Sequence, residues 1–320
     1  MCIRDRSTEL CFILFCLFTL TIIYAGVRNG IERVSKFMMP ILIVLSVLIA
    51  VYSVTRPGAM EGVKYFLVPN VKNFSWMTVV AAMGQMFYSL SIAMGILITF
   101  GSYMKKETSL EDSTRNVEVF DTAIAIMAGL MIIPAVFAFS GGDPDTLQAG
   151  PALMFITIPK VFENMGFGTV VGILFFLLVL FAAVTSSIAL TESAVSTFED
   201  ELGWSRRRAT VLVGVIMIAL GSLSSLGYGP LAGIKIIGMQ FLDFFDFLTN
   251  SVMMPIAAML TSLFVSRIVG MKRMEEEIMH GESTFRRKKI FIVMIKYLCP
   301  VFALIILISS VANAFGWIAM

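Results

Sequence analysis

Long, mostly apolar runs with few charges alternate along this chain with shorter charged connections. Eight of these runs reach about 18 residues or more, the length at which an apolar helix can cross a bilayer. They lie near residues 9–27, 37–54, 76–104, 118–140, 169–198, 209–228, 239–266 and 290–318. The pattern predicts an all-α protein whose fold is a polytopic transmembrane helical bundle with eight spans.

The third run differs from the others in length and in what lies at its middle. Residues 73–104 form 32 consecutive uncharged positions, and a straight helix of that length would measure about 48 Å, against roughly 30 Å for the hydrocarbon core. Three hydroxyls, those of Tyr88, Ser89 and Ser91, lie between two glycines at its centre. An opened backbone at membrane depth survives only where it is buried in protein or lines a cavity. We therefore expect a helix interrupted near 88–91, whose freed carbonyls and half-helix ends could hold a cation and a zwitterion.

The connections between the runs differ strongly in charge. Hydrophobic residues make up 58% of the chain and charged residues 14%, against about 25% charged in an average soluble domain. Alternate connections carry sixteen basic residues on one side and five on the other. The positive-inside rule predicts that the richer side, formed by 26–36, 105–115, 199–208 and 267–289, is cytoplasmic. The net charge of +2 gives no sign of nucleic-acid binding, because the basic residues fall in these connections.

Several classes of chemistry find little support in the residues. The four cysteines, Cys2, Cys11, Cys16 and Cys299, lack metal-ligand spacing, and His280 is the single histidine. Neither a zinc site, nor a disulfide, nor a histidine-based hydrolase is expected. No nucleophile–base pair is evident, so we do not expect an enzyme.

Four carboxylates lie within the predicted spans, where an ionisable group is costly and is a functional candidate by default. Asp121 opens the fourth span, and compensation of the helix dipole is its alternative role. Glu192 lies late in the fifth span and is expected to accept hydrogen bonds from opened backbone. Asp243 and Asp246 open the seventh span, where either could pair with a cation across an outer vestibule or face water.

The fifth span places small and hydroxyl-bearing residues on one helical face. Ala182, Thr185, Ser186, Ala189 and Glu192 follow helical spacing. Two hydroxyls there could donate oxygens to a sodium ion, whereas the alternative is a small-residue face for helix packing. The connection 140–168 contains glycines and prolines, which favour turns, and then an apolar segment, 152–161. We therefore expect one or two short helices that form an extracellular lid. A plain surface loop is the alternative.

These residues together resemble the neurotransmitter:sodium symporter family, in its bacterial amino-acid branch, over about residues 8–318. The resemblance is carried by GIERVSK at 30–36, GQMFYSLS at 84–91, TSSIA at 185–189, FEDEL at 198–202 and DFFD at 243–246. It implies the inverted-repeat sodium symporter fold, N-terminally truncated, with the spans standing for the family's fourth to eleventh helices. The implied organisation is 1–8 outside the family, 9–56 as the last two helices of the first repeat, 76–266 as the second repeat of five helices with the lid at 140–168, and 290–320 as the final helix.

The resemblance also implies two sodium sites. It assigns Ser89 and Asp121 to the first site, through a hydroxyl and a carboxylate. It assigns Ala182, Thr185 and Ser186 to the second site, through a carbonyl and two hydroxyls.

Substrate contacts and gates are implied by the same matches. The substrate residues are Tyr88, Ser89, Ser91, Met94, Ser186 and Leu190. Tyr88 is the aromatic lid over the substrate, and Asp246 is the acid of the outer gate. Tyr103 and Asp200 match the inner gate.

The implied function is sodium-coupled symport of an amino acid across the cytoplasmic membrane by alternating access. A hydrophobic or aromatic substrate is expected, because Met94 gives a flexible apolar wall. Chloride is not expected, because Ala123, Ile124 and Ala125 occupy the turn where chloride-dependent members have a serine. The expected partners are an amino acid, sodium ions and the lipid bilayer.

The part of the family that this chain resembles does not include the family's first three helices. In the family, the first helix supplies half of both sodium sites. We therefore expect residues 1–320 by themselves not to transport and to be a fragment of a transporter. A proton-coupled carrier of the same fold and a non-transporting membrane scaffold or regulatory fragment are the alternatives.

Overall fold

The computed structural model describes residues 2–70, 74–140, 153–163, 166–281 and 284–317. Helices form the regular secondary structure of these residues, with one isolated antiparallel bridge between Ile236 and Met239. Seven helical segments in this part of the chain are long and apolar enough to cross a membrane. They are Ser7–Tyr24, Val27–Val54, Leu110–Ser140, Gly168–Leu202, Arg206–Leu226, Phe241–Val269 and Lys288–Ala314.

These segments confirm seven of the eight predicted spans. The remaining span, 76–104, is divided into α4 (Trp76–Ser89) and α5 (Ile96–Ser102), and neither half reaches the length of a bilayer crossing. The prediction of an interrupted helix in this run is therefore confirmed.

The chain forms two compact units, which we describe one at a time. Unit 1 contains Met1–Gly26, Ser75–Val117 and Ile188–Met320, and unit 2 contains Val27–Phe74 and Glu118–Ser187. The long helices α6 (Leu110–Ser140) and α8 (Gly168–Leu202) contribute residues to both units. The repeat boundaries implied by the resemblance remain a prediction.

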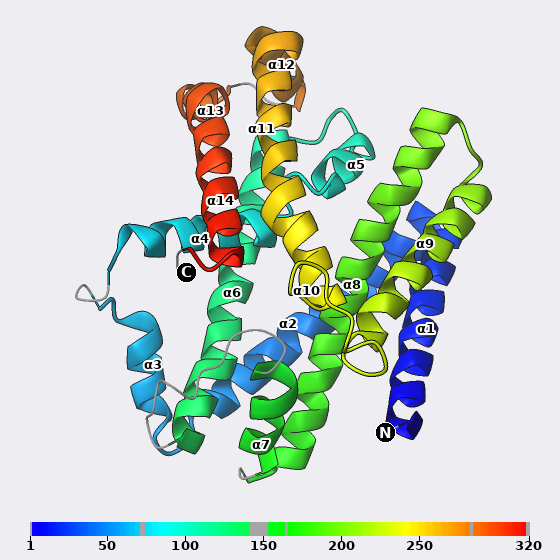
Figure 1. Ribbon diagram of the computed structural model, residues 1–320. Helices are drawn as coiled ribbons and strands as arrows, with labels where there is room; N and C mark the ends of the chain where they lie inside the picture. Colours follow the sequence, from blue (N-terminus) through cyan, green and yellow to red (C-terminus); the bar gives the residue numbers. More distant parts are fainter. Residues whose placement is uncertain (1, 71–73, 141–152, 164–165, 282–283, 318–320) are drawn as a thin grey trace. The chain divides into compact units, whose positions relative to one another are not determined.

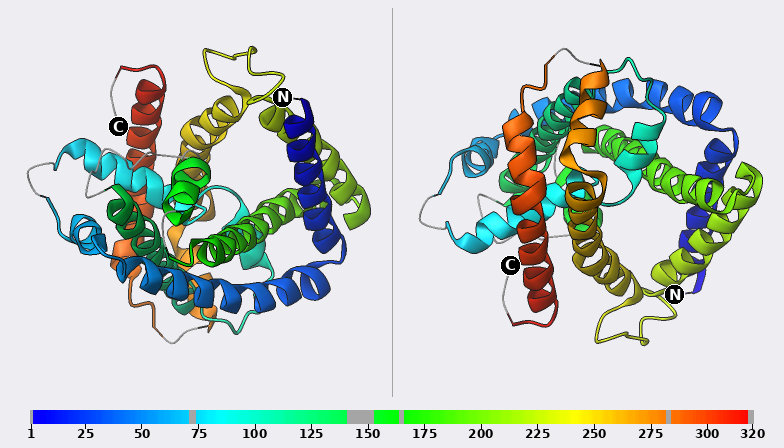
Figure 2. Two further views of the ribbon diagram at one scale, coloured as in Figure 1. Left: turned by 90° about the horizontal axis from the view of Figure 1, so that it is seen from below. Right: turned by 90° about the horizontal axis from the view of Figure 1, so that it is seen from above.

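In unit 1, α1 (Cys2–Tyr24) lies beside α9 (Arg206–Leu226) (Figures 1 and 2). Glycines on α9 permit this close packing: Leu20 lies against Gly214, and Phe12 against Gly221. A Cβ atom at either glycine would come closer than 3.0 Å to these side chains. Small residues at such a crossing are typical of membrane helices.

The C-terminal half of unit 1 contains two long segments that pack on each other. The first consists of α10 (Phe241–Asp246), η5 (Phe247–Met253), α11 (Met254–Phe264) and η6 (Val265–Val269). The second consists of α13 (Lys288–Val293), η8 (Met294–Leu298) and α14 (Cys299–Ala314), after the connecting α12 (Met271–Ile278) and η7 (Met279–Gly281). The Ser262 hydroxyl donates to the Ile295 carbonyl at 2.6 Å, which ties the two segments together.

Unit 2 has a core built by four helices. Its elements are η1 (Val27–Ile31), α2 (Glu32–Val54), α3 (Ala59–Leu67), η4 (Leu153–Thr157) and α7 (Ile158–Glu163), with parts of α6 and α8. Ile49 of α2, Val136 of α6, Ile158 of α7 and Phe175 of α8 are all buried in one cluster. The predicted lid is thus helical where it is described and anchored by apolar burial, while residues 141–152 and 164–165 lie outside the described residues.

The connection 56–75 also contains a helix, α3, which packs closely on α6. A Cβ atom at Gly62 would lie 2.8 Å from the Cα of Pro134, and one at Gly129 would meet the ring of Phe66. Two glycines, one on each helix, therefore permit this contact.

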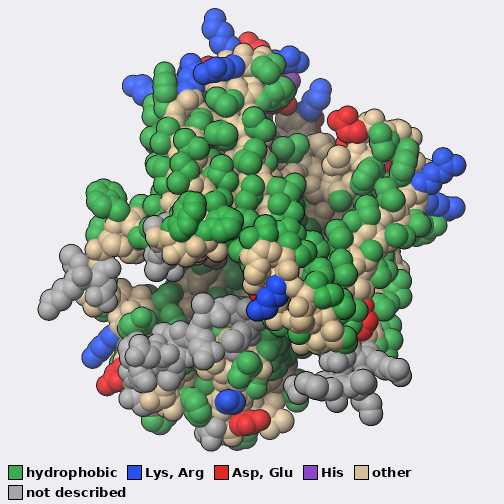
Figure 3. Space-filling view, viewed as in Figure 1, with side chains coloured by type: hydrophobic (Ala, Val, Ile, Leu, Met, Phe, Trp, Pro, Cys, Tyr) green, Lys and Arg blue, Asp and Glu red, His purple; other side chains and the backbone are tan. Residues whose placement is uncertain are grey.

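Lys and Arg side chains gather at one end of unit 1. Figure 3 shows them over α12 and α13 and beside the connection between α8 and α9. This distribution fits the charge alternation of the sequence, because these connections belong to the basic set.

Candidate functional site

The break between α4 and α5 has a defined backbone geometry. α4 ends in a Schellman motif, in which the Ile92 amide donates to the Phe87 carbonyl at 3.1 Å and the Ser91 amide donates to the Tyr88 carbonyl at 3.0 Å. Ser91 occupies the left-handed position of this motif with φ 54°. Glycine is usual there, because a side chain in this conformation costs about 1–2 kcal/mol.

Two further left-handed residues complete the break. Ala93 has φ 63° and Gly95 has φ 78°, and α5 begins at Ile96. The opened stretch is thus 90–95. The expectation that the backbone opens around 88–91 is corrected in detail, because Tyr88 and Ser89 lie in the last turn of α4.

The strain at Ala93 leads to a testable expectation. Ala93→Gly should raise the free energy of unfolding by about 1 kcal/mol, because glycine adopts a positive φ without a Cβ penalty. Thermal unfolding of the purified protein measures this change. The same substitution at Ala81, in the interior of α4, should instead destabilise by roughly 0.5–1 kcal/mol, and equal effects at the two positions would contradict the strain.

The predicted substrate residues of the broken helix lie in the last turn of α4 and in the break that follows it. Tyr88 is half exposed and Ser89 is exposed, whereas Ser91 and Met94 are half-buried within the break. The described structure therefore gathers four of the predicted substrate residues along one short segment. Their role as ligands remains a prediction.

The residues predicted for the second sodium site lie on α8 within unit 2. The Thr185 hydroxyl contacts the Ala182 carbonyl at 3.0 Å and the Phe181 carbonyl at 3.1 Å. Ser186 is exposed. A hydroxyl and a carbonyl predicted as ligands are thus adjacent on one helix, as the spacing implied. The predicted pocket residue Leu190 lies further along α8, in unit 1, and is half exposed.

The residues predicted for the first sodium site belong to different units. Ser89 lies in unit 1 and Asp121 in unit 2. The expectation that Asp121 opens a helix is wrong, because α6 begins at Leu110 and has Glu111 and Asp112 in its first turn. Compensation of the helix dipole therefore no longer accounts for Asp121, since that effect fades within the first turn.

An ionic cluster around the buried Glu192 joins four elements of unit 1 beside the predicted inner gate. The carboxylate of Glu192, which is 0% exposed, accepts from both terminal nitrogens of Arg206, at 3.1 and 2.5 Å. It also accepts from the Tyr103 hydroxyl at 2.8 Å. Arg206 donates further to Glu199 at 3.3 Å and to the carbonyl of Ile23, at the end of α1, at 2.8 Å.

This cluster changes the expectation for Glu192. Glu192 was expected to bond to opened backbone, but its described partners are the side chains of Tyr103 and Arg206. Tyr103, predicted at the inner gate, is attached through Glu192 to α8 and α9. Asp200, predicted as the inner gate acid, is exposed near the end of α8.

Buried hydroxyls hold α5 against α8 next to this cluster. The Thr99 hydroxyl lies 3.2 Å from that of Ser196 and 3.5 Å from that of Ser193. The Ser193 hydroxyl in turn contacts the carbonyl of Met94, in the break, at 3.4 Å. α5 is therefore attached to α8 by polar contacts at Thr99, at Tyr103 just after the helix, and at the Met94 carbonyl just before it.

The predicted outer gate acid has a local partner. Asp246 accepts from the Asn250 amide at 2.5 Å, one turn along the same segment. Asp243 accepts from the Tyr228 hydroxyl at 3.3 Å. Burial and the nearby Asp243 carboxylate raise the pKa of Tyr228.

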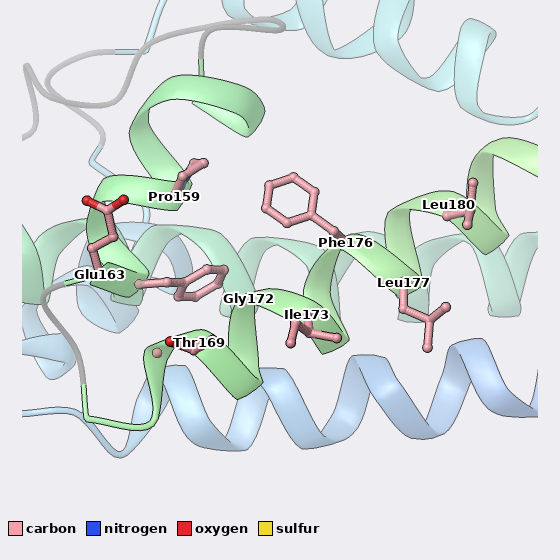
Figure 4. Close-up of a pocket in the computed structure, with 10 residues that line it drawn as sticks. Pro159, Glu163, Thr169, Gly172, Ile173, Phe176, Leu177 and Leu180 are labelled. Carbon is pink, nitrogen blue, oxygen red and sulfur yellow. The ribbon is translucent and has the colours of Figure 1, made fainter. Parts of the chain in front are cut away.

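Each unit contains an apolar cavity. In unit 2, a cavity of about 590 Å³ lies between α7 and α8, and Figure 4 shows Pro159 of α7 with Phe176 and Leu177 of α8 among its walls. In unit 1, a cavity of about 310 Å³ lies against the broken helix. Of the predicted substrate residues, Ser91 lines the unit 1 cavity.

Sequence reasoning missed the role of Arg206 in the ionic cluster around Glu192. Arg206 was counted with the basic residues of a cytoplasmic connection. A usable signal was present, however: Glu192 lies within an apolar span, and a buried carboxylate requires a partner. Three consecutive arginines begin α9, shortly after the end of α8.

Comparisons with known proteins give a consistent result. The sodium:neurotransmitter symporter family matches residues 6–316. The chain is 35% identical, over 85% of its length, to an uncharacterized sodium-dependent transporter, YhdH, of Bacillus subtilis, and 32% identical, over 93%, to an uncharacterized sodium-dependent transporter of Haemophilus influenzae. The crystal structure of MhsT in complex with L-phenylalanine matches 93% of the chain with a TM-score of 0.80 and 36% identity.

The chain spans 59%, 64% and 66% of the lengths of these three proteins, respectively. The family match covers nearly the whole chain, and the fold agrees with that of a solved structure at substantial sequence identity. With seven apolar helices among its described residues, this multi-pass membrane protein belongs to the sodium:neurotransmitter symporter family.

Proposed function

We propose that this protein carries out sodium-coupled symport of a hydrophobic or aromatic amino acid across the cytoplasmic membrane. The observation that supports this most directly is the break between α4 and α5, inside a run without charges. Uncharged irregular backbone at this depth is suited to binding a polar substrate in place of water.

The two ends at the break have opposite electrostatic character. The C-terminal end of α4 carries a partial negative charge, and the N-terminal end of α5 carries a partial positive charge. A zwitterionic amino acid can align its ammonium group with the first and its carboxylate with the second. Ser89, in the last turn of α4, would supply a hydroxyl to a sodium ion near the negative end.

The second ion is assigned to α8. Thr185, Ser186 and the Ala182 carbonyl offer uncharged oxygens, which suit a sodium ion. Asp121 would provide the negative charge at the first ion. Because a carboxylate already supplies that charge, we propose transport without chloride and with no cofactor beyond the co-transported sodium.

The substrate class rests on two observations. Met94, in the break, offers a flexible apolar side chain to a pocket wall. The related MhsT was crystallised with L-phenylalanine. We therefore assign aromatic or other large apolar amino acids, and expect them to compete with one another for uptake.

The inner cluster suggests how access to the inside is controlled. Tyr103 directly follows α5 and is hydrogen-bonded to Glu192 of α8, and the hydroxyls of Thr99 and Ser193 lie close together. Separation of α5 from α8 would break these contacts. In our proposal these contacts keep the inner gate closed, and Tyr103 is the residue that moves when the gate opens.

Uptake of radiolabelled L-phenylalanine into proteoliposomes tests the proposal. The complete gene product containing this chain should take up substrate under an inward sodium gradient and not when choline replaces sodium. Thr185→Val should raise the sodium concentration for half-maximal uptake by roughly tenfold or more, because it removes an oxygen ligand of a charged group. Thr21→Val, at a helical hydroxyl that contacts the Leu17 carbonyl at 2.7 Å, is the matched control and should leave it unchanged.

Each outcome separates the proposal from its alternatives. Uptake that continues in choline and follows a proton gradient would replace sodium coupling by proton coupling. Uptake that stops when gluconate replaces chloride would refute chloride independence. The absence of uptake by the complete gene product, together with its specific co-purification with another membrane protein, would favour a scaffold. In a separate arm with residues 1–320 alone, we expect no uptake.

A further inference from the structure

The cavity of unit 1 lies behind the broken helix, between three elements that are distant in sequence. One wall is formed by α4, the break and α5, a second by α11 and η6, and a third by η8 and α14. Phe87 belongs to the first wall, Thr261 to the second and Phe302 to the third. The volume of about 310 Å³ is at the lower end of the range for cavities that bind small molecules.

This cavity is distinct from the substrate site proposed above. Of the predicted substrate residues on the broken helix, Ser91 lines it, whereas Tyr88, Ser89 and Met94 do not. The other lining residues, which come from α4, the break, α5, α11, η6, η8 and α14, are not assigned to substrate or sodium. The cavity therefore faces another side of the break.

The lining selects for an apolar occupant. None of the described residues that line it is charged, and their polar side chains are the hydroxyls of Ser91, Thr261 and Ser262 and the thiol of Cys299. The Ser262 hydroxyl already donates to the Ile295 carbonyl at 2.6 Å. A charged or strongly polar ligand would lose its hydration there without sufficient compensation.

The rim of the cavity indicates where such an occupant comes from. Met86, Leu97 and Ile98 all line the cavity and are 51%, 50% and 68% exposed. Exposed apolar side chains at membrane depth are suited to contact with lipid chains. The cavity is therefore bordered by an apolar surface that acyl chains can contact.

We propose that this cavity binds an acyl chain of a membrane lipid, which packs against the broken segment from behind. Ser91, Ala93 and Gly95, three left-handed residues of the break, all belong to its wall. An occupant therefore contacts the backbone whose geometry defines the break. It stabilises whichever conformation of the protein contains the cavity, and so couples lipid occupancy to the conformation of the broken helix.

A photoreactive lipid tests this site directly. The chain is reconstituted in nanodiscs containing a phosphatidylglycerol with a diazirine midway along one acyl chain, and crosslinked peptides are identified after illumination. We expect crosslinks at lining residues of α11 and α14. Ala258→Phe, which places a ring in the cavity, should reduce them by about fivefold or more by filling the volume, and Ala257→Phe, at a neighbouring position that does not line it, should not.

The controls distinguish loss of lipid binding from loss of folding. Size-exclusion profile and helical circular dichroism establish that each variant folds, and Ala258→Leu replaces Ala258→Phe if the larger variant does not. Equal crosslinking in both variants, or crosslinks confined to residues outside the cavity, overturns the proposal. Labelling of the cavity by a photoreactive decanol but not by the lipid also overturns it, in favour of a small soluble lipophile. None of these readouts depends on transport, so failure of the symport proposal would remain distinguishable.

Discussion

Arg206→Met should lower the free energy of unfolding by roughly 3–5 kcal/mol, because it leaves the buried carboxylate of Glu192 without its cation. Arg206 satisfies both oxygens of that carboxylate and also reaches Glu199 and the Ile23 carbonyl. Loss of the guanidinium therefore affects α1, α8 and α9 together. Thermal and denaturant unfolding in detergent, followed by tryptophan fluorescence, measures the effect.

Two further variants separate charge from packing. Arg208→Met, at an exposed position two residues later in the same turn, should change stability by less than about 1 kcal/mol. Arg206→Met with Glu192→Gln should recover a large part of the loss, because the remaining buried group is neutral. If Arg206→Met and Arg208→Met are equally stable, the buried ion pair does not hold this part of unit 1 together.

Gly95→Ala should destabilise the protein by about 2–4 kcal/mol, through backbone strain and a steric clash. Gly95 has φ 78°, and a Cβ atom there would lie 2.6 Å from the Ser193 hydroxyl oxygen. Ser193 is buried and contacts the Met94 carbonyl, so its side chain has little room to move. The same unfolding measurement applies, and sodium-driven uptake should fall as well if the break is the substrate site.

Gly101→Ala is the matched control for this substitution. Gly101 lies within α5, and a Cβ atom there would have no neighbour within 4 Å. The change should be neutral or stabilising by up to about 1 kcal/mol, because alanine is the better helix former. Gly95→Ala with Ser193→Ala should recover the part of the loss that comes from the clash and retain the strain. A Gly95→Ala protein as stable as the Gly101→Ala protein would refute the left-handed geometry of the break.

The local pattern was sufficient to locate the spans and the break. The 32 uncharged residues of the third run exceed the bilayer thickness, and hydroxyls with flanking glycines at its centre indicated an interruption there. The break was nevertheless misplaced by a few residues. The Schellman motif places serine at its left-handed position, a conformation that composition alone does not reveal.

The partners of the polar residues depended on contacts between segments distant in sequence. Glu192 was recognised as costly at membrane depth, but its position did not identify which groups would approach it. Tyr103 and Arg206 reach it from α5 and α9, which lie before and after α8 in the chain. Likewise, Asp121 was placed at a helix start because charges before it ended the apolar run, whereas α6 continues through those charges to Leu110.

The sequence by itself determined the membrane class, the spans, the basic side, the interrupted helix and the family resemblance, because each follows from local hydropathy, charge or motif. Tertiary structure alone decided the Glu192–Arg206–Tyr103 cluster, the hydroxyl contacts between α5 and α8, and the apolar cavity behind the break. These features arise where helices from separate parts of the chain pack together. Burial and hydrogen-bond geometry at such a contact depend on both partners, and a one-dimensional pattern specifies only one of them at a time.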